Sequence, residues 1–103
     1  MIVVNSLGSN RTLTEYLTQG GVAVDLTDAL VEIHIRCALG LTAVTTATVV
    51  GDPTIGEVSY TLTPADIGVA GIYQYAWHVT LPNQTVLILP ETGPNAMRVL
   101  DTI

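Results

Sequence analysis

The sequence predicts an all-β fold, an antiparallel β-sandwich of about seven to eight strands. Threonine, valine and isoleucine dominate the chain, and segments of about five to ten residues are separated by glycine, proline, asparagine and aspartate. Short segments rich in β-branched residues between such turn residues are typical of a sandwich. Signals for helices are nearly absent from the pattern.

The first half of the chain begins with an edge strand and a connector. Residues 11–18 (RTLTEYLT) predict a two-sided strand at the edge of a sheet, with Leu13, Glu15 and Leu17 on one face and Thr12, Thr14, Tyr16 and Thr18 on the other. Gly20 and Gly21 end this strand, and residues 22–26 form a short connector. Residues 25–28 (DLTD) predict a turn whose aspartate side chains bond to nearby amides.

Residues 30–37 (LVEIHIRC) form the clearest core strand of this half, because apolar and polar residues alternate without a break. Ile33 and Ile35 belong to the inward face of this strand. The outward face carries Glu32, His34 and Arg36.

Three segments then lead to the centre of the fold. Residues 41–50 carry no charge on either face, which suits a strand shielded on one side and paired or covered on the other. A turn at residues 51–54 precedes a strand over residues 57–62, with Tyr60 on its inward face. Residues 64–68 (PADIG) predict a single helical turn.

The longest strand is predicted over residues 71–81 (GIYQYAWHVTL), and its aromatic face is expected to form the centre of the core. Tyr73, Tyr75 and Trp77 share that face. Immunoglobulin-like domains often place a corner tyrosine just after a short polar turn, so we expect an immunoglobulin-like sandwich. The remaining segments are a hairpin at residues 82–84, a strand at 85–89, a rigid loop at 90–95 and a last strand at 96–100.

Composition and charge narrow the class of protein. The 103 residues fit a single domain over residues 1–103, with residues 1–10 as a candidate extended assembly arm. Charged residues make up 12% of the chain and the net charge is -6. Nucleic acid and anionic membranes are not expected as partners, because both require clustered cations. A surface this poor in charge favours an oligomer or a lattice.

The single cysteine, Cys37, cannot form an internal disulfide, and we interpret it as a small buried hydrophobic side chain. The amino-terminal sequence lacks the basic start and long apolar run of a secretory signal. No apolar run approaches the length of a membrane helix. We therefore expect synthesis and folding in the cytoplasm of a host cell.

No group of side chains predicts catalysis. His34 and His78 lie on the outward faces of two different strands with no third ligand nearby, whereas a zinc site needs three or four donors. A calcium site at Asp25 and Asp28 is the weaker alternative to turn formation, because the loop lacks an alternating ligand pattern. No serine lies in a nucleophile elbow. We expect a protein that is not an enzyme and holds no metal or cofactor.

The run Gly56 to Asp66 (GEVSYTLTPAD), then Gly71-Ile72-Tyr73, and finally Met97-Arg98-Val99-Leu100 resemble small immunoglobulin-like domains of tailed-phage virions. In particular, the chain resembles the amino-terminal domain of phage baseplate upper proteins over about residues 22–100, and residues 25–31 match a strand motif of that family. The resemblance implies a virion protein whose partners are other virion proteins. Baseplate proteins continue after this domain, whereas this sequence ends at Ile103, which favours a free-standing virion accessory.

The expected function is that of a capsid decoration, or cement, protein that binds the major capsid protein and stabilises the assembled shell. The alternative is a tail or baseplate adaptor. The third hypothesis is a carbohydrate-binding module, which requires an exposed Trp77 or Tyr16 beside acidic loops. Polarity and edge position predict the assembly contacts, which are Ile2, Val3, Val4, Leu13, Tyr16, Pro90 and Pro94.

Overall fold

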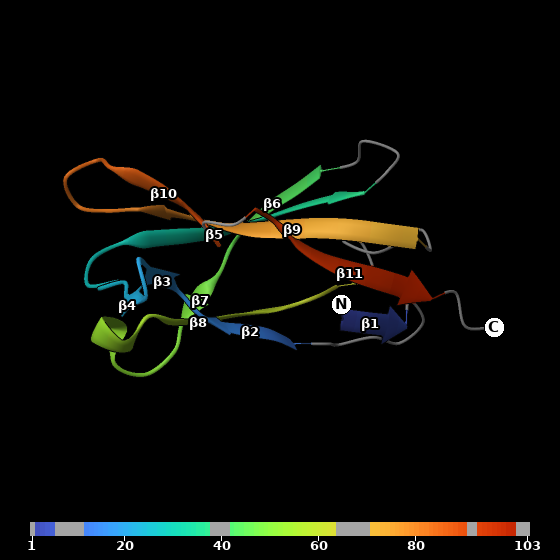
Figure 1. Cartoon of the computed structure of the whole chain (residues 1–103), viewed down its shortest axis with the longest axis horizontal. Helices are drawn as coiled ribbons and strands as arrows, with labels where there is room; N and C mark the ends of the chain where they lie inside the picture. The colour runs from blue at the N-terminus through green and yellow to red at the C-terminus, as the bar shows by residue number, and fades with distance from the viewer. Residues whose placement is uncertain (1, 6–11, 38–41, 64–70, 91–92, 101–103) are drawn as a thin grey trace.

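Two β-sheets face each other in the computed structural model of this protein, and Figure 1 shows them as two layers. The structure describes residues 2–5, 12–37, 42–63, 71–90 and 93–100. Within these ranges the regular structure is β-strand, apart from the 3-10 helix η1 (Pro53–Ile55). The predicted all-β sandwich is confirmed, but the described residues form eleven strands, several of them short, where about seven to eight were expected.

Sheet A is built around its two longest strands, β5 (Leu30–Cys37) and β9 (Gly71–Thr80), which pair antiparallel along the whole length of β5. The strand order is β1-β11-β9-β5-β6, and β10 also pairs with β9. The other strands of sheet A are β1 (Ile2–Asn5), β6 (Thr42–Thr46), β10 (Val86–Leu89) and β11 (Asn95–Leu100).

Strands β10 and β11 lie on the same side of β9, one after the other. Leu89 of β10 is opposite Trp77, and Asn95 of β11 is opposite Tyr75. Ala76 lies between these two positions of β9. The chain leaves the sheet here and returns to it, so the strand row beside β9 is interrupted at this residue.

Sheet B is smaller and has the order β2-β8-β7. Its strands are β2 (Thr12–Tyr16), β7 (Thr48–Val49) and β8 (Glu57–Thr61). Strand β2 is an edge strand, as its alternation predicted. The chain crosses from sheet A to sheet B at Ala47, which is buried and donates its amide hydrogen to Val31 O at 2.9 Å. A separate hairpin joins β3 (Thr18–Gln19) to β4 (Val22–Ala23).

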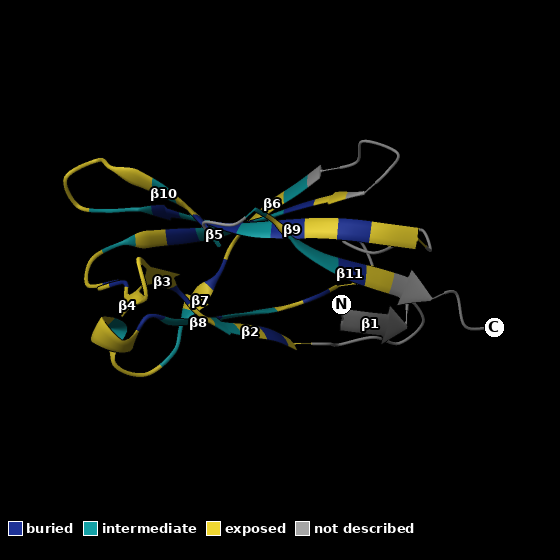
Figure 2. Cartoon of the chain, viewed as in Figure 1, coloured by how far each residue is buried: buried dark blue, intermediate teal, exposed yellow. Residues whose placement is uncertain are grey.

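The core fills the space between the sheets, and Figure 2 shows buried residues alternating with more exposed ones along β9. Trp77 and Ile33 are both fully buried and lie opposite each other on β9 and β5. The Tyr75 and Trp77 rings meet edge to face at 6.2 Å. Burial of each large side chain contributes about 1.5–3 kcal/mol relative to exposure. The remaining buried hydrophobic residues of the described part are Leu13, Leu17, Val24, Leu26, Val31, Ile35, Ala47, Val58, Leu62, Tyr73, Val79, Leu89 and Met97.

Two aspartates hold loops at one end of the sandwich. The Asp25 carboxylate accepts hydrogen bonds from the amide and hydroxyl of Thr27, at 3.0 and 2.6 Å. Asp52 accepts the same pair of bonds from Thr54, at 2.9 and 2.8 Å, and caps η1. These hydrogen bonds lower the pKa of both carboxyl groups. The turn predicted at residues 25–28 is therefore present, with the aspartate bonding to a nearby amide.

Two predicted features differ from the structure. Residues 2–5 do not extend away as an arm, because they form β1 and pair in parallel with β11, from Ile2 opposite Met97 to Asn5 opposite Leu100. This pairing satisfies backbone groups that an open edge of β11 would expose. Leu13 is 2% exposed, so it is a core side chain and offers no surface for assembly. The helical turn predicted at residues 64–68 lies outside the described residues.

Candidate interaction surface

The broadest exposed sheet face is the side of sheet A that points away from sheet B, here called the outer face. The outward residues of β5 and β9 form its centre, because these strands alternate inward and outward side chains. The described outer-face residues are Leu30, Glu32, His34, Arg36, Val44, Thr46, Ile72, Gln74, Ala76, His78, Thr80, Val86, Ile88, Ala96 and Arg98.

Large apolar side chains are exposed on this face. Val44 is 50% exposed, Ile72 46%, Val86 55% and Ile88 59%. They belong to three different strands, β6, β9 and β10, so the apolar groups are spread across the sheet. An open sheet face in solution is normally polar, and apolar groups in this number are typical of a surface that contacts another molecule.

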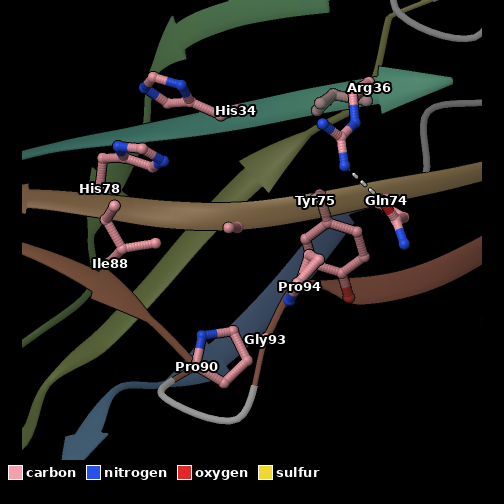
Figure 3. Close-up of a pocket in the computed structure, with 11 residues that line it drawn as sticks. His34, Arg36, Gln74, Tyr75, His78, Ile88, Pro90, Gly93 and Pro94 are labelled. Atoms are coloured by element: carbon pink, nitrogen blue, oxygen red, sulfur yellow. Dashed lines mark hydrogen bonds between the residues drawn. The ribbon is translucent and has the colours of Figure 1, made fainter.

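A concavity of about 350 Å³ lies in this face at Ala76, and Figure 3 shows its lining. We call it the Ala76 pocket. It forms where the row of strands beside β9 is interrupted. Ala76 forms the floor of the pocket, and its small side chain leaves the space above it open. Its lining consists of His34, Ile35, Arg36, Gln74, Tyr75, Ala76, His78, Ile88, Pro90, Gly93 and Pro94.

One wall of the Ala76 pocket holds a stacked pair of imidazoles. The rings of His34 and His78 are 3.5 Å apart and nearly parallel, with an interplanar angle of 9°. His34 Nε2 has no hydrogen-bond partner among the described residues, and Glu32 Oε1 lies 3.8 Å from it. Burial lowers the pKa of His78, the nearby His34 lowers it further, and Glu32 opposes the shift. Burial thus favours the neutral form of the His78 ring in the folded protein.

The opposite wall carries a cation and an amide. Arg36 Nη2 donates to Gln74 Oε1 at 2.8 Å, across the β5–β9 pairing (Figure 3). A guanidinium has five N–H donors, and this bond uses one of them. Ile88, Pro90 and Pro94 make the remaining side of the pocket apolar. The site thus combines one fixed positive charge with an apolar wall.

Charge is distributed unevenly over the molecule. Arg36 and Arg98 both lie on the outer face, whereas the chain has three cationic side chains in total. Among the acids of the described part, Glu32 lies on this face. The other acids in that part lie in sheet B or in loops, and they are Glu15, Asp25, Asp28, Asp52 and Glu57.

Apart from the buried Leu13, the predicted assembly residues divide into three groups. Pro90 and Pro94 line the Ala76 pocket, and Pro94 is exposed. Tyr16 is 62% exposed at the end of β2, away from the outer face. Ile2, Val3 and Val4 lie in β1, at the edge of sheet A.

The predicted core residues are brought together between the sheets. Ile33, Ile35, Tyr73, Tyr75 and Trp77 are at most 4% exposed, and Tyr60 is partly buried against them. Because Trp77 is fully buried, it cannot stack on a sugar, which removes one of the two side chains that the carbohydrate hypothesis required.

Within the described ranges, no group of three or more histidine, cysteine, aspartate or glutamate side chains is placed to hold a metal ion. Asp25 and Asp52 instead bond to the threonines of their own turns. A separate finding concerns membranes: no helix in the described part of the chain is long and apolar enough to cross one.

Sequence reasoning missed that His34 and His78 are neighbours. It placed them on the outward faces of two strands but did not pair those strands. Since the two best alternating strands of a sandwich are often adjacent in its larger sheet, pairing them antiparallel would have brought the histidines together. The sequence carries no comparable signal for the Ala76 pocket, because the pocket depends on where β10 ends and β11 begins.

The class of this protein, as its fold defines it, is an all-β sandwich that exposes apolar side chains on one sheet face. The family of this domain follows from comparison with known proteins. The chain matches the family model described as the BppU N-terminal domain over residues 6–88, and this match covers most of its length. The protein therefore belongs to the family of amino-terminal domains of phage baseplate upper proteins, which confirms the resemblance found in the sequence. No curated protein is similar enough to the chain to count as a match.

Proposed function

We propose that this chain is a non-enzymatic docking domain of a phage tail or baseplate, which attaches to another virion protein. The observation that carries the proposal is the family match over residues 6–88. The exposed apolar side chains of the outer face support it, because a permanent partner would bury them.

The expected capsid decoration function takes second place to this one. Its main support was low surface charge, which fits any permanent interface and does not distinguish the head from the tail. The family is that of a baseplate domain, so it favours the tail or baseplate adaptor that the sequence offered as an alternative.

The test is cosedimentation of the purified chain with separated tails and with emptied heads of the phage that encodes it. We expect the chain to sediment with tails that lack it and to remain in the supernatant with heads. Binding to heads alone would favour capsid decoration and contradict the proposal. Binding to neither particle would contradict both functions.

Heat-denatured chain serves as the control for nonspecific adsorption in both mixtures. A second control uses tails that already carry the protein, where the sites are filled and added chain is expected to stay in solution. Saturation of the vacant tails at a fixed number of copies would distinguish a defined site from adhesion.

A further inference from the structure

We infer that the Ala76 pocket receives an acidic side chain, next to an apolar one, from an extended segment of the partner virion protein. This inference rests on the proposed function and specifies which surface docks and which chemistry it selects. It does not follow from family membership, which says nothing about the pocket.

The size of the pocket limits what can enter. At about 350 Å³ it lies at the small end of ligand sites, which range from about 300 to 1,000 Å³. Such a space holds one or two side chains and not a folded surface. A protruding segment fits it better than a flat interface, and the exposed Ile72 and Val44 beyond the pocket offer such a segment further apolar contact.

The charges of the pocket select an acid. Arg36 is held in place by its bond to Gln74, so its guanidinium is oriented before the partner arrives. A carboxylate can accept two parallel N–H bonds from a guanidinium, and a pre-oriented one loses less freedom on binding. A basic side chain would meet Arg36 at short range and be repelled.

Among the described residues, one acid lies on the outer face, and it does not cancel this preference. Glu32 lies beside His34 and is not part of the pocket lining. On the other side, Ile88 and Pro90 provide an apolar wall, where an aliphatic neighbour of the acid can pack. The partner segment thus carries a charge complementary to Arg36, on the face that holds both described arginines of an acidic chain.

Two matched pairs of variants test the inference in the cosedimentation assay. Arg36→Gln removes the pocket cation, and Arg98→Gln removes an equal charge from the same face outside the pocket. Ala76→Leu fills the pocket floor, and Ala96→Leu adds the same group outside it. We expect Arg36→Gln and Ala76→Leu to weaken binding about tenfold or more, as loss of a charged hydrogen bond does. The two controls are expected to stay within about threefold of the wild type.

The four substituted side chains lie on the outer face and not in the core, so we expect all four variants to fold. Thermal melting of each variant verifies this. Equal binding by a pocket variant and its control would overturn the inference while leaving the proposed function intact. Sedimentation of the free chain tests a second copy as the occupant. If the free chain self-associates and Arg36→Gln abolishes this association, the occupant of the pocket is a second copy of the chain. That result would overturn the inference that the occupant belongs to a different virion protein.

A probe measurement separates the pocket from the proposed function. The peptide N-acetyl-Leu-Glu-Leu-amide is titrated into the labelled chain and followed by NMR, with the Leu-Gln-Leu peptide as its match. We expect shifts around Ala76 and Ile88 with the glutamate peptide alone, and their loss in Arg36→Gln. That result without tail binding would contradict the proposed function but keep the pocket chemistry. Equal shifts with both peptides would overturn the acid preference.

Discussion

Replacing Gly56 with alanine is expected to destabilise the domain much more than the same change at Gly51. Both glycines have left-handed backbone angles, with φ of 73° at Gly56 and 63° at Gly51. They differ in their surroundings. A Cβ at Gly56 would lie 2.7 Å from Leu17 O and 3.0 Å from Val24 O, whereas a Cβ at Gly51 would have no described atom within 4 Å.

The structure gives the size of the difference. Each alanine costs about 1–2 kcal/mol for the left-handed conformation. At Gly56 the backbone of Leu17 and Val24 must also move, and such overpacking costs about 1–3 kcal/mol more. The movement strains the bonds from Leu17 N to Gly56 O at 2.8 Å and from Val24 N to Leu17 O at 3.0 Å. We therefore expect Gly56→Ala to be less stable than Gly51→Ala by about 2 kcal/mol.

Urea unfolding followed by circular dichroism measures both free energies. For a domain of this size, a difference of 2 kcal/mol corresponds to about 10 °C in melting temperature. The Gly51 variant is the internal control for the backbone conformation alone. If the two variants agree within about 0.5 kcal/mol, the close approach of β8, β4 and the β2–β3 junction around Gly56 does not limit stability, and the reasoning is refuted.

Three further predictions concern single side chains. Trp77 is fully buried, so its native fluorescence is expected to be blue-shifted and resistant to iodide, and quenching equal to that of the urea-unfolded chain would contradict the core assignment. The pKa of His78 is lowered in the folded state, so the unfolded chain binds a proton more readily. The free energy of unfolding is therefore expected to fall as pH drops below about 6.5. Urea midpoints measured at several pH values should fall less steeply in His78→Asn, which keeps His34, than in the wild type. Glu15 accepts a bond from Asn95 Nδ2 at 2.7 Å and links the two sheets, so Glu15→Ala is expected to cost about 1 kcal/mol in urea unfolding while Glu15→Gln, which keeps an acceptor oxygen, costs less.

The fold was predictable because period-2 alternation fixes which side chains face inward. Residues 30–37 alternate without a break, and the structure buries Val31, Ile33 and Ile35 on the face that the alternation predicted. The turn at residues 25–28 was also predictable, since aspartate followed by threonine two positions later bonds locally.

The parallel pairing of β1 with β11 and the Ala76 pocket could not be predicted in the same way. Both depend on contacts between segments that are distant in the sequence, and alternation gives no register between strands. The amino-terminal segment IVVN pairs with β11 at a sheet edge, and nothing in its own residues specifies that partner. The interruption of the strand row at Ala76 likewise requires knowing that β10 and β11 share one side of β9.

The residues that we expect to limit stability and those that we propose for docking lie in different parts of this molecule, so experiments can separate the two effects. Gly56 and the aspartate-bonded turns lie at the end of the sandwich near η1, where they hold loops to sheet B (Figure 1). Arg36 and Ala76 lie on the outer face of sheet A, outside the core. Gly56→Ala should therefore lower the melting temperature while folded molecules still bind tails, and Arg36→Gln should weaken binding without a matching loss of stability. A variant of either kind that changed both quantities in proportion would mean that the outer face is not an independent site.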